Sequence, residues 1–208
     1  MKQEIDPKDT NRAIAFELWT KSRMPMVTIT KTFDVTRLRK VSRRSGMKFN
    51  MLLCWCIGRA ASRIEDVYML PQDGKLYKYY RMAVNVIVNN IKGGLSFCDV
   101  AVCDDLETFN DNYLRLTKTI SQTCWDILDE EAVIVGTSAV TGTELDCIVN
   151  QYSGIFNNPF LSWARYRKGW FRTTLPISFQ FHHAQMDGCQ AARFLEELQK
   201  IINRLHLS

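Results

Sequence analysis

The stretch from Leu175 to Leu205 changes its hydrophobic period once, and this change constrains the fold more than any other feature of the sequence. From Leu175 to about His183, apolar and polar residues alternate, a two-residue period that predicts a β-strand. From about Cys189 to Leu205, apolar residues recur every three or four positions, which predicts an amphipathic helix. Asp187 and Gly188 between them predict a turn and a helix N-cap. The chain is therefore expected to end in a strand that turns directly into a helix.

Two adjacent histidines close the predicted strand, and they cannot share an environment. Neighbouring strand residues point to opposite faces, so His183 points the same way as Phe181 and His182 points the other way. An imidazole aimed at an apolar region, with Asp187 four residues on, is a setting in which a general base can be tuned. The alternative is a histidine packed for structural reasons. A metal site at His182, His183 and Asp187 is disfavoured by the opposite orientations, so no metal is expected.

The remainder of the chain is predicted to form strands and helices without repeats or linkers. Strands are expected over residues 26–33, 82–89, 95–102, 132–140 and 145–150, and helices over 11–21, 36–45, 49–64 and 106–128. Asp73-Gly74 between two short runs predicts a hairpin. Residues 151–173 are irregular and aromatic, and we expect a pocket wall, a subunit contact or a surface loop there. The whole pattern predicts one α+β domain over residues 1–208, a mixed sheet covered by helices.

The distribution of the basic residues is compatible with a solvated helix face or a phosphate-binding surface, and it disfavours a nucleic-acid-binding surface. The net charge of +5 is mild for 208 residues. The densest cluster lies on one short stretch and comprises Arg37, Arg39, Lys40, Arg43, Arg44 and Lys48. Such a cluster is typical of a solvated helix face, or of a surface that docks a phosphorylated ligand such as a nucleotide-bearing cofactor. Nucleic acid is not expected as a partner, because no aromatic residues interleave with the cluster.

Cysteine usage and hydropathy indicate the compartment. The seven cysteines, an odd number without C-x-x-C spacing, predict free thiols in a reducing environment. The N-terminal stretch is polar and lacks the apolar core of a secretory signal. No run approaches the roughly eighteen apolar residues of a membrane span. We therefore expect a cytoplasmic protein with no membrane partner.

Several motifs together resemble the chloramphenicol acetyltransferase family. The family's H-H-x-x-x-D-G signature, at a strand-to-helix junction near the C-terminus, is matched by His182-His183-Ala184-Gln185-Met186-Asp187-Gly188. The first predicted helix carries the family-type Arg12, and Asp73-Gly74-Lys75-Leu76 is similar to the family's D-G-E-L hairpin. The resemblance runs over about residues 10–205. It implies the CoA-dependent acyltransferase (CAT-like) fold, which the family shares with the acyltransferase cores of 2-oxo acid dehydrogenase complexes.

The resemblance implies an activity, a co-substrate and roles for three residues. The expected reaction is direct acetyl transfer from acetyl-CoA to a hydroxyl of a small molecule, chloramphenicol or similar, as in antibiotic resistance. His183 would be the general base, and Asp187 would form a structural ion pair with Arg12, although Asp187 as a helix cap alone is compatible with the sequence. The family's homotrimer, with active sites between subunits, is expected here too. A lipoyl-bearing carrier as acceptor is disfavoured, because no lipoyl domain or Ala/Pro-rich linker is found in the chain.

One segment departs from the family. A P-W-x-x-F-T-type stretch normally supplies a hydroxyl near the oxyanion of the tetrahedral intermediate, and the corresponding residues 143–152 lack it. Candidate replacements are Thr141, Thr143, Cys147 and Ser153. Removing one oxyanion donor costs about 10²–10³ in turnover. The alternative reading is thus a CAT-like protein with weak or lost catalysis that only binds a ligand or partner.

Overall fold

A computed structural model describes residues 2–152 and 154–206 of the chain. The strands are β1 (Lys2–Ile5), β2 (Met26–Asp34), β3 (Met69–Gln72), β4 (Lys75–Tyr79), β5 (Met82–Asn89), β6 (Leu95–Ala101), β7 (Val133–Val140), β8 (Phe160–Ala164), β9 (Arg167–Lys168) and β10 (Thr173–His182). The α-helices are α1 (Ala13–Trp19), α2 (Thr36–Ser45), α3 (Phe49–Ala61), α4 (Leu106–Thr123) and α5 (Gly188–Arg204). Short 3₁₀ turns cover Pro7–Asp9 and Glu65–Tyr68.

The main sheet has seven strands, with the order β2-β10-β8-β7-β5-β6 and β9 added beside β10. The pairs β5–β7 and β7–β8 are parallel, whereas β10 is antiparallel to β2, β8 and β9. A separate antiparallel sheet has the order β1-β4-β3. The expected α+β class with a mixed sheet covered by helices is confirmed.

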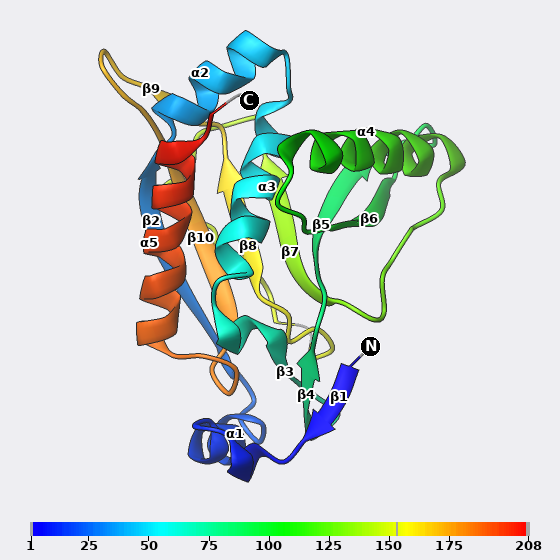
Figure 1. Ribbon diagram of the computed structural model, residues 1–208, viewed down its shortest axis with the longest axis vertical. Coiled ribbons are helices and arrows are strands. Elements are labelled where there is room, and N and C mark those ends of the chain that lie inside the picture. The colour runs from blue at the N-terminus through cyan, green and yellow to red at the C-terminus, as the bar shows by residue number, and fades with distance from the viewer. Residues whose placement is uncertain (1, 153, 207–208) are drawn as a thin grey trace.

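The helices lie on one side of the main sheet and enclose the core (Figure 1). In this view α3 and α5 run side by side in front of the sheet, α4 lies across β5 and β6, and α2 lies at the top. Helix α3 is buried nearly all round, because it is covered by the sheet on one side and by α5, α2 and α4 on others. Helix α1 and the three-stranded sheet lie at the bottom, near the end of β10.

The local signals in the sequence explain most element ends. The hairpin turn between β3 and β4 uses Asp73 and Gly74 with φ of 51° and 74°, a geometry that Asp-Gly readily adopts. Helix α2 ends at Gly46, whose φ of 76° lies in the left-handed region. Helix α5 begins with a capping box formed by Asp187 and Gln190.

Three expectations about the elements were wrong. Helix α4 ends at Thr123 rather than near residue 128, because Cys124 is left-handed and the chain then runs along β6, where Asp126 accepts from the Phe97 N–H. No strand forms over residues 145–150, and β8 lies instead within the segment expected to be irregular. Both sides of β10 are already paired with β2 and β8, so residues 145–150 are held by side chains across the sheet.

Candidate active site

His183 lies one residue past β10, at the bottom end of the sheet. Its backbone N–H and its backbone carbonyl are both hydrogen-bonded. Its N–H donates to the Pro25 carbonyl at 2.8 Å. Its carbonyl accepts from the Arg12 guanidinium at 2.7 Å. Two segments remote in sequence therefore fix the position of this residue.

The His183 ring is half-buried and stacks on Trp19 at the end of α1. The ring centroids are 4.5 Å apart and the planes differ by 12°. Nδ1 is buried and has no hydrogen-bond partner among the described residues. This leaves Nε2, on the other side of the ring, as the nitrogen that can exchange a proton with a bound molecule.

His182 sits in a different environment from its neighbour. Only 2% of its surface is exposed, and its Nδ1 accepts from the Ala184 N–H at 3.0 Å. Burial, with a smaller contribution from His183, lowers the pKa of His182 to about 4. His182 is therefore neutral near pH 7, and its ring serves the local backbone.

Asp187 and Arg12 form an ion pair that ties the N-terminal region to the start of α5. Nη1 of Arg12 lies 3.0 Å from Oδ2 of Asp187, and Nε donates to the Ala184 carbonyl at 3.2 Å. Asp187 also accepts from the Cys189 N–H as the N-cap of α5. The Cys189 N–H and then Arg12 hold the pKa of Asp187 below its usual value. Asp187 is linked to His183 through Arg12, whose guanidinium donates to both the Asp187 carboxylate and the His183 carbonyl.

The other face of β10 is polar and is covered by residues 145–150. Ser178 accepts from the Ile148 N–H at 2.9 Å and Gln180 donates to the Asn150 carbonyl at 3.0 Å. Ser162 on β8 donates to Oδ1 of Asn150 at 2.8 Å. Since side chains alternate along a strand, this face and His183 lie on opposite sides of β10.

The residues expected near an oxyanion are scattered. Thr141, Thr143 and Cys147 are all exposed. Thr141 lines a pocket at the top of the sheet, and the Thr143 hydroxyl has only a 3.4 Å contact with the Glu144 carbonyl. Ser153 lies outside the described residues. Within the described chain, the structure brings none of the other three next to His183.

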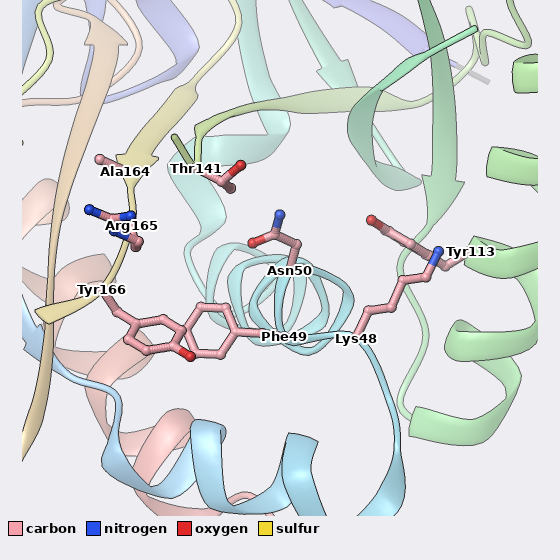
Figure 2. A pocket seen from close by; sticks show the side chains of 8 residues that line it. All are labelled: Lys48, Phe49, Asn50, Tyr113, Thr141, Ala164, Arg165 and Tyr166. Atoms are coloured by element: carbon pink, nitrogen blue, oxygen red, sulfur yellow. The ribbon is translucent and has the colours of Figure 1, made fainter. Parts of the chain in front are cut away.

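A cationic pocket of about 390 Å³ opens at the opposite end of the sheet from His183. Figure 2 looks along α3 and shows Lys48, Asn50, Thr141 and Arg165 around the opening, with the Tyr166 and Phe49 rings beside each other. The two ring centroids are 5.0 Å apart, and Arg39 of α2 lies over Tyr166 at 5.9 Å. Two members of the basic cluster, Arg39 and Lys48, therefore lie beside an aromatic wall together with one further cation, Arg165.

Sequence reasoning missed several of these residues. Ser162 lies on a strand that was not expected, and Asn150 carried no motif. Trp19 was visible only as an apolar residue of the first helix, with no signal that it would meet His183. Tyr166 belongs to the aromatic segment for which a pocket wall was one expectation, and the pocket confirms that expectation for this residue.

Residues 2–152 and 154–206, which the structure describes, contain neither a candidate metal cluster nor a candidate membrane span. No group of three or more His, Cys, Asp or Glu side chains in them is arranged to hold a metal ion. None of their helices combines the length and the apolar character needed to cross a bilayer.

Comparison with known proteins gives consistent relatives over nearly the whole chain. The family model described as chloramphenicol acetyltransferase matches residues 2–199. Chloramphenicol acetyltransferase 3 of Escherichia coli is 26% identical over 212 residues, covering 96% of each chain. A solved chloramphenicol acetyltransferase superposes with a TM-score of 0.80 at 18% identity, over 97% of this chain and 100% of that one. The cubic core of a pyruvate dehydrogenase multienzyme complex gives a TM-score of 0.61 at 17% identity, over 92% of this chain and 86% of that one.

Proposed function

The chain belongs to the chloramphenicol acetyltransferase family, and on that premise we propose that it transfers the acetyl group of acetyl-CoA directly to a hydroxyl of a small molecule, chloramphenicol or a similar compound, with His183 as the general base. Membership makes the protein an acyltransferase that uses an acyl-CoA. The acetyl group, the acceptor and the role of His183 are the proposal.

The observation that carries the proposal is the setting of the His183 ring. Its backbone is clamped by Pro25 and Arg12, and its plane is fixed against Trp19. Because Nδ1 is buried, Nε2 is the ring nitrogen available for proton exchange. A single imidazole held in one orientation is suited to general base catalysis, which contributes about 10²–10⁴ in rate.

The proposed reaction proceeds without an acyl-enzyme. Nε2 of His183 takes the proton of the acceptor hydroxyl while the acceptor oxygen attacks the thioester carbon. The carbonyl π electrons move to the carbonyl oxygen and form a tetrahedral oxyanion. When these electrons return, the C–S bond breaks, and the CoA thiolate leaves and takes the proton from the imidazolium. The ester and free CoA are released, and His183 is neutral again.

The cationic pocket is proposed to bind the nucleotide end of acetyl-CoA. Lys48 and Arg165 suit phosphate groups, and the Tyr166 ring suits stacking by a nucleobase. Trp163, just before the pocket, pairs with Ile177, and His183 lies six residues further along the chain, just past the end of β10. At about 3.3 Å per residue, this separates the pocket from the level of His183 by roughly 20 Å. A CoA thioester is an extended molecule whose acyl group lies at the far end from its phosphates, so it can run along the sheet.

A homotrimer with active sites between subunits is part of the proposal. His183 and the polar face of the sheet leave β10 on opposite sides, so one chain alone does not bring them together. Val149 in the segment over that face and, further along the chain, Ile155 and Phe156 are large apolar side chains that are exposed in the single chain, at 75%, 75% and 70%. Large apolar side chains exposed in this way are typical of a protein interface.

The test replaces His183 and follows CoA release. Thiol release from acetyl-CoA is measured with chloramphenicol and a panel of hydroxylated acceptors. His183→Ala is expected to lower kcat by about 10²–10⁴ while the circular dichroism spectrum is unchanged. His206→Ala is the matched control, because His206 is exposed and contacts Arg37 on α2, a helix at the opposite end of the sheet from α1 in Figure 1. Full turnover by His183→Ala would exclude this residue as the base.

The same assay tests the binding-only alternative, which the lack of the P-W-x-x-F-T-type stretch over residues 143–152 still favours. In that case the wild-type chain releases no thiol with any acceptor, but acetyl-CoA raises its Tm by mass action. Turnover with any acceptor of the panel rules this alternative out.

A further inference from the structure

The Asn150 side chain holds a hydrogen-bond donor that the described protein does not use. Its Nδ2 is buried and has no partner among the described residues. More than about 90% of buried polar groups in proteins are hydrogen-bonded, and an unsatisfied one costs about 1–3 kcal/mol. An unused buried donor on a polar face near a proposed active site therefore needs an explanation.

The rest of Asn150 is fixed, so the free donor has a defined direction. Ser162 donates to Oδ1 at 2.8 Å, which assigns the oxygen side of the amide. The main-chain carbonyl of Asn150 accepts from Gln180, which also contacts the Thr28 hydroxyl at 3.3 Å. Two strands, β8 and β10, thus hold the amide with its NH₂ turned away from Ser162.

We propose that Nδ2 of Asn150 donates a hydrogen bond to the thioester oxygen as that oxygen becomes the tetrahedral oxyanion. The inference rests on the proposed acetyl transfer, and it gives an amide donor to residues 143–152, which lack the P-W-x-x-F-T-type stretch. The thioester oxygen gains most from this hydrogen bond when the carbonyl electrons have moved onto it. It gains least once those electrons return and expel the thiolate. A preorganised amide donor in this role is worth about 10²–10³ in kcat.

The geometry assigns Asn150 and His183 of one active site to different chains. Asn150 lies on the polar face of β10, and His183 leaves the strand on the other side. Residues 145–150 cover the polar face, so in the proposed trimer a neighbouring protomer that packs on this segment would supply the His183 that faces this Asn150. The exposed Val149, directly before Asn150, lies where such a neighbour would pack.

The first experiment compares Asn150→Asp and Asn150→Ala with the wild type. Asp keeps the shape and the acceptor for Ser162 but has no donor at the second position, so both variants are expected to lose about 10²–10³ in kcat. The KM for acetyl-CoA is expected to change less than about threefold, because the lost bond forms only with the oxyanion. A structural role for Nδ2 would instead lower Tm and leave kcat unchanged.

Two further variants separate orientation from packing. Ser162→Ala removes the group that orients the amide, so it is expected to lower kcat by about tenfold, and adding it to Asn150→Ala is expected to cost little more. Asn157→Asp is the matched control on the same segment, because its Nδ2 already donates to the Pro71 carbonyl at 2.7 Å. This control is expected to lower Tm without the loss in kcat.

A hybrid experiment tests the placement on two chains. His183→Ala and Asn150→Ala chains, each nearly inactive alone, are unfolded together and refolded as mixed oligomers. Sites that combine His183 from one chain with Asn150 from the other are then complete, so activity is expected to reappear. No recovery would overturn the two-chain arrangement.

The outcomes also separate this inference from the proposed function. If wild-type turnover is abolished by His183→Ala but kept by both Asn150 variants, the assignment of Asn150 is overturned and the acetyl transfer stands. If the wild-type chain transfers no acyl group to any acceptor, the acetyl transfer and the role of Asn150 both fail.

Discussion

At the scale of the residue, the two histidines show how one peptide step separates two chemistries. His182 is buried and accepts a hydrogen bond from the Ala184 N–H at Nδ1, which requires the neutral ring with its proton on Nε2. His183 is half-buried with its ring against Trp19. The first ring is a structural acceptor and the second has a nitrogen free for proton transfer.

The buried His182 predicts a pH dependence of stability. Its pKa is lowered from 6.5 to about 4, so between these values the unfolded chain binds a proton that the folded chain does not. Stability is therefore expected to fall as the pH falls from about 6.5 to about 4, by up to roughly 3 kcal/mol from this residue. The lowered pKa of Asp187 keeps that carboxylate charged over this window, since its contribution is lost only at lower pH.

Urea unfolding at several pH values checks this prediction. His182→Asn keeps an acceptor for the Ala184 N–H but does not titrate, so the fall in unfolding free energy below pH 6.5 is expected to flatten. His206→Asn is the control, because His206 is exposed, and it is expected to keep the wild-type slope. An unchanged slope in His182→Asn would show that another group carries the effect.

At the scale of the element, the junction between β10 and α5 depends on Arg12 from the other end of the chain. Only 5% of Arg12 is exposed, and it donates to the carbonyls of His183 and Ala184 as well as to Asp187. The side chain of Asp187 is 42% exposed and also caps α5. Arg12 therefore carries more of the junction than the ion pair alone suggests.

This asymmetry predicts unequal effects for the two partners. Arg12→Met leaves two carbonyls and a carboxylate without their donor, and is expected to cost about 3 kcal/mol of unfolding free energy. Asp187→Asn remains a good N-cap and loses only the charge, so about 1 kcal/mol is expected. Urea denaturation measures both values. Equal losses would mean that the ion pair, and not the carbonyl contacts, holds the junction.

The elements also show which parts of the fold can be read from sequence. Strand β5 has the expected bounds, Met82–Asn89, because its β-branched run and the turn after it are local signals. Strand β8 was missed because it lies between β7 and β10 and its residues Leu161–Ala164 are buried without alternation. Helix α4 stops at Cys124, a residue type that gives no sign of a left-handed backbone.

The residues of the candidate site likewise fall into those that local sequence signals predict and those that they do not. His183, Asp187 and Arg12 were expected because a motif and a helix position carry them. Asn150 lies outside the strands and contacts Ser162 of β8 and Gln180 of β10, and Trp19 contacts His183 from a helix at the other end of the chain. These contacts depend on long-range register, which a local pattern in the sequence does not contain.

At the scale of the whole molecule, the single chain leaves three large apolar side chains exposed that lie close together in sequence. They are Val149, Ile155 and Phe156, each at least 70% exposed. Large apolar side chains close together on a surface are typical of an interface. Burial of one such side chain contributes about 1.5–3 kcal/mol to the stability of the assembly. A proposed trimer would bury them and complete the active site in the same step.

This coupling of assembly and catalysis gives the last prediction. Light scattering after gel filtration is expected to find three times the 24.1 kDa chain mass. Phe156→Asp is expected to give a folded monomer without turnover, because the side chain is 70% exposed in the single chain but would bury a charge in the interface. Ile91→Asp is the control, since Ile91 is 73% exposed but lies in the turn between β5 and β6, remote in sequence from Val149, Ile155 and Phe156. A monomeric wild type with full turnover would contradict the shared site. If instead Phe156→Asp loses assembly and turnover together and Ile91→Asp loses neither, catalysis requires the neighbouring chain.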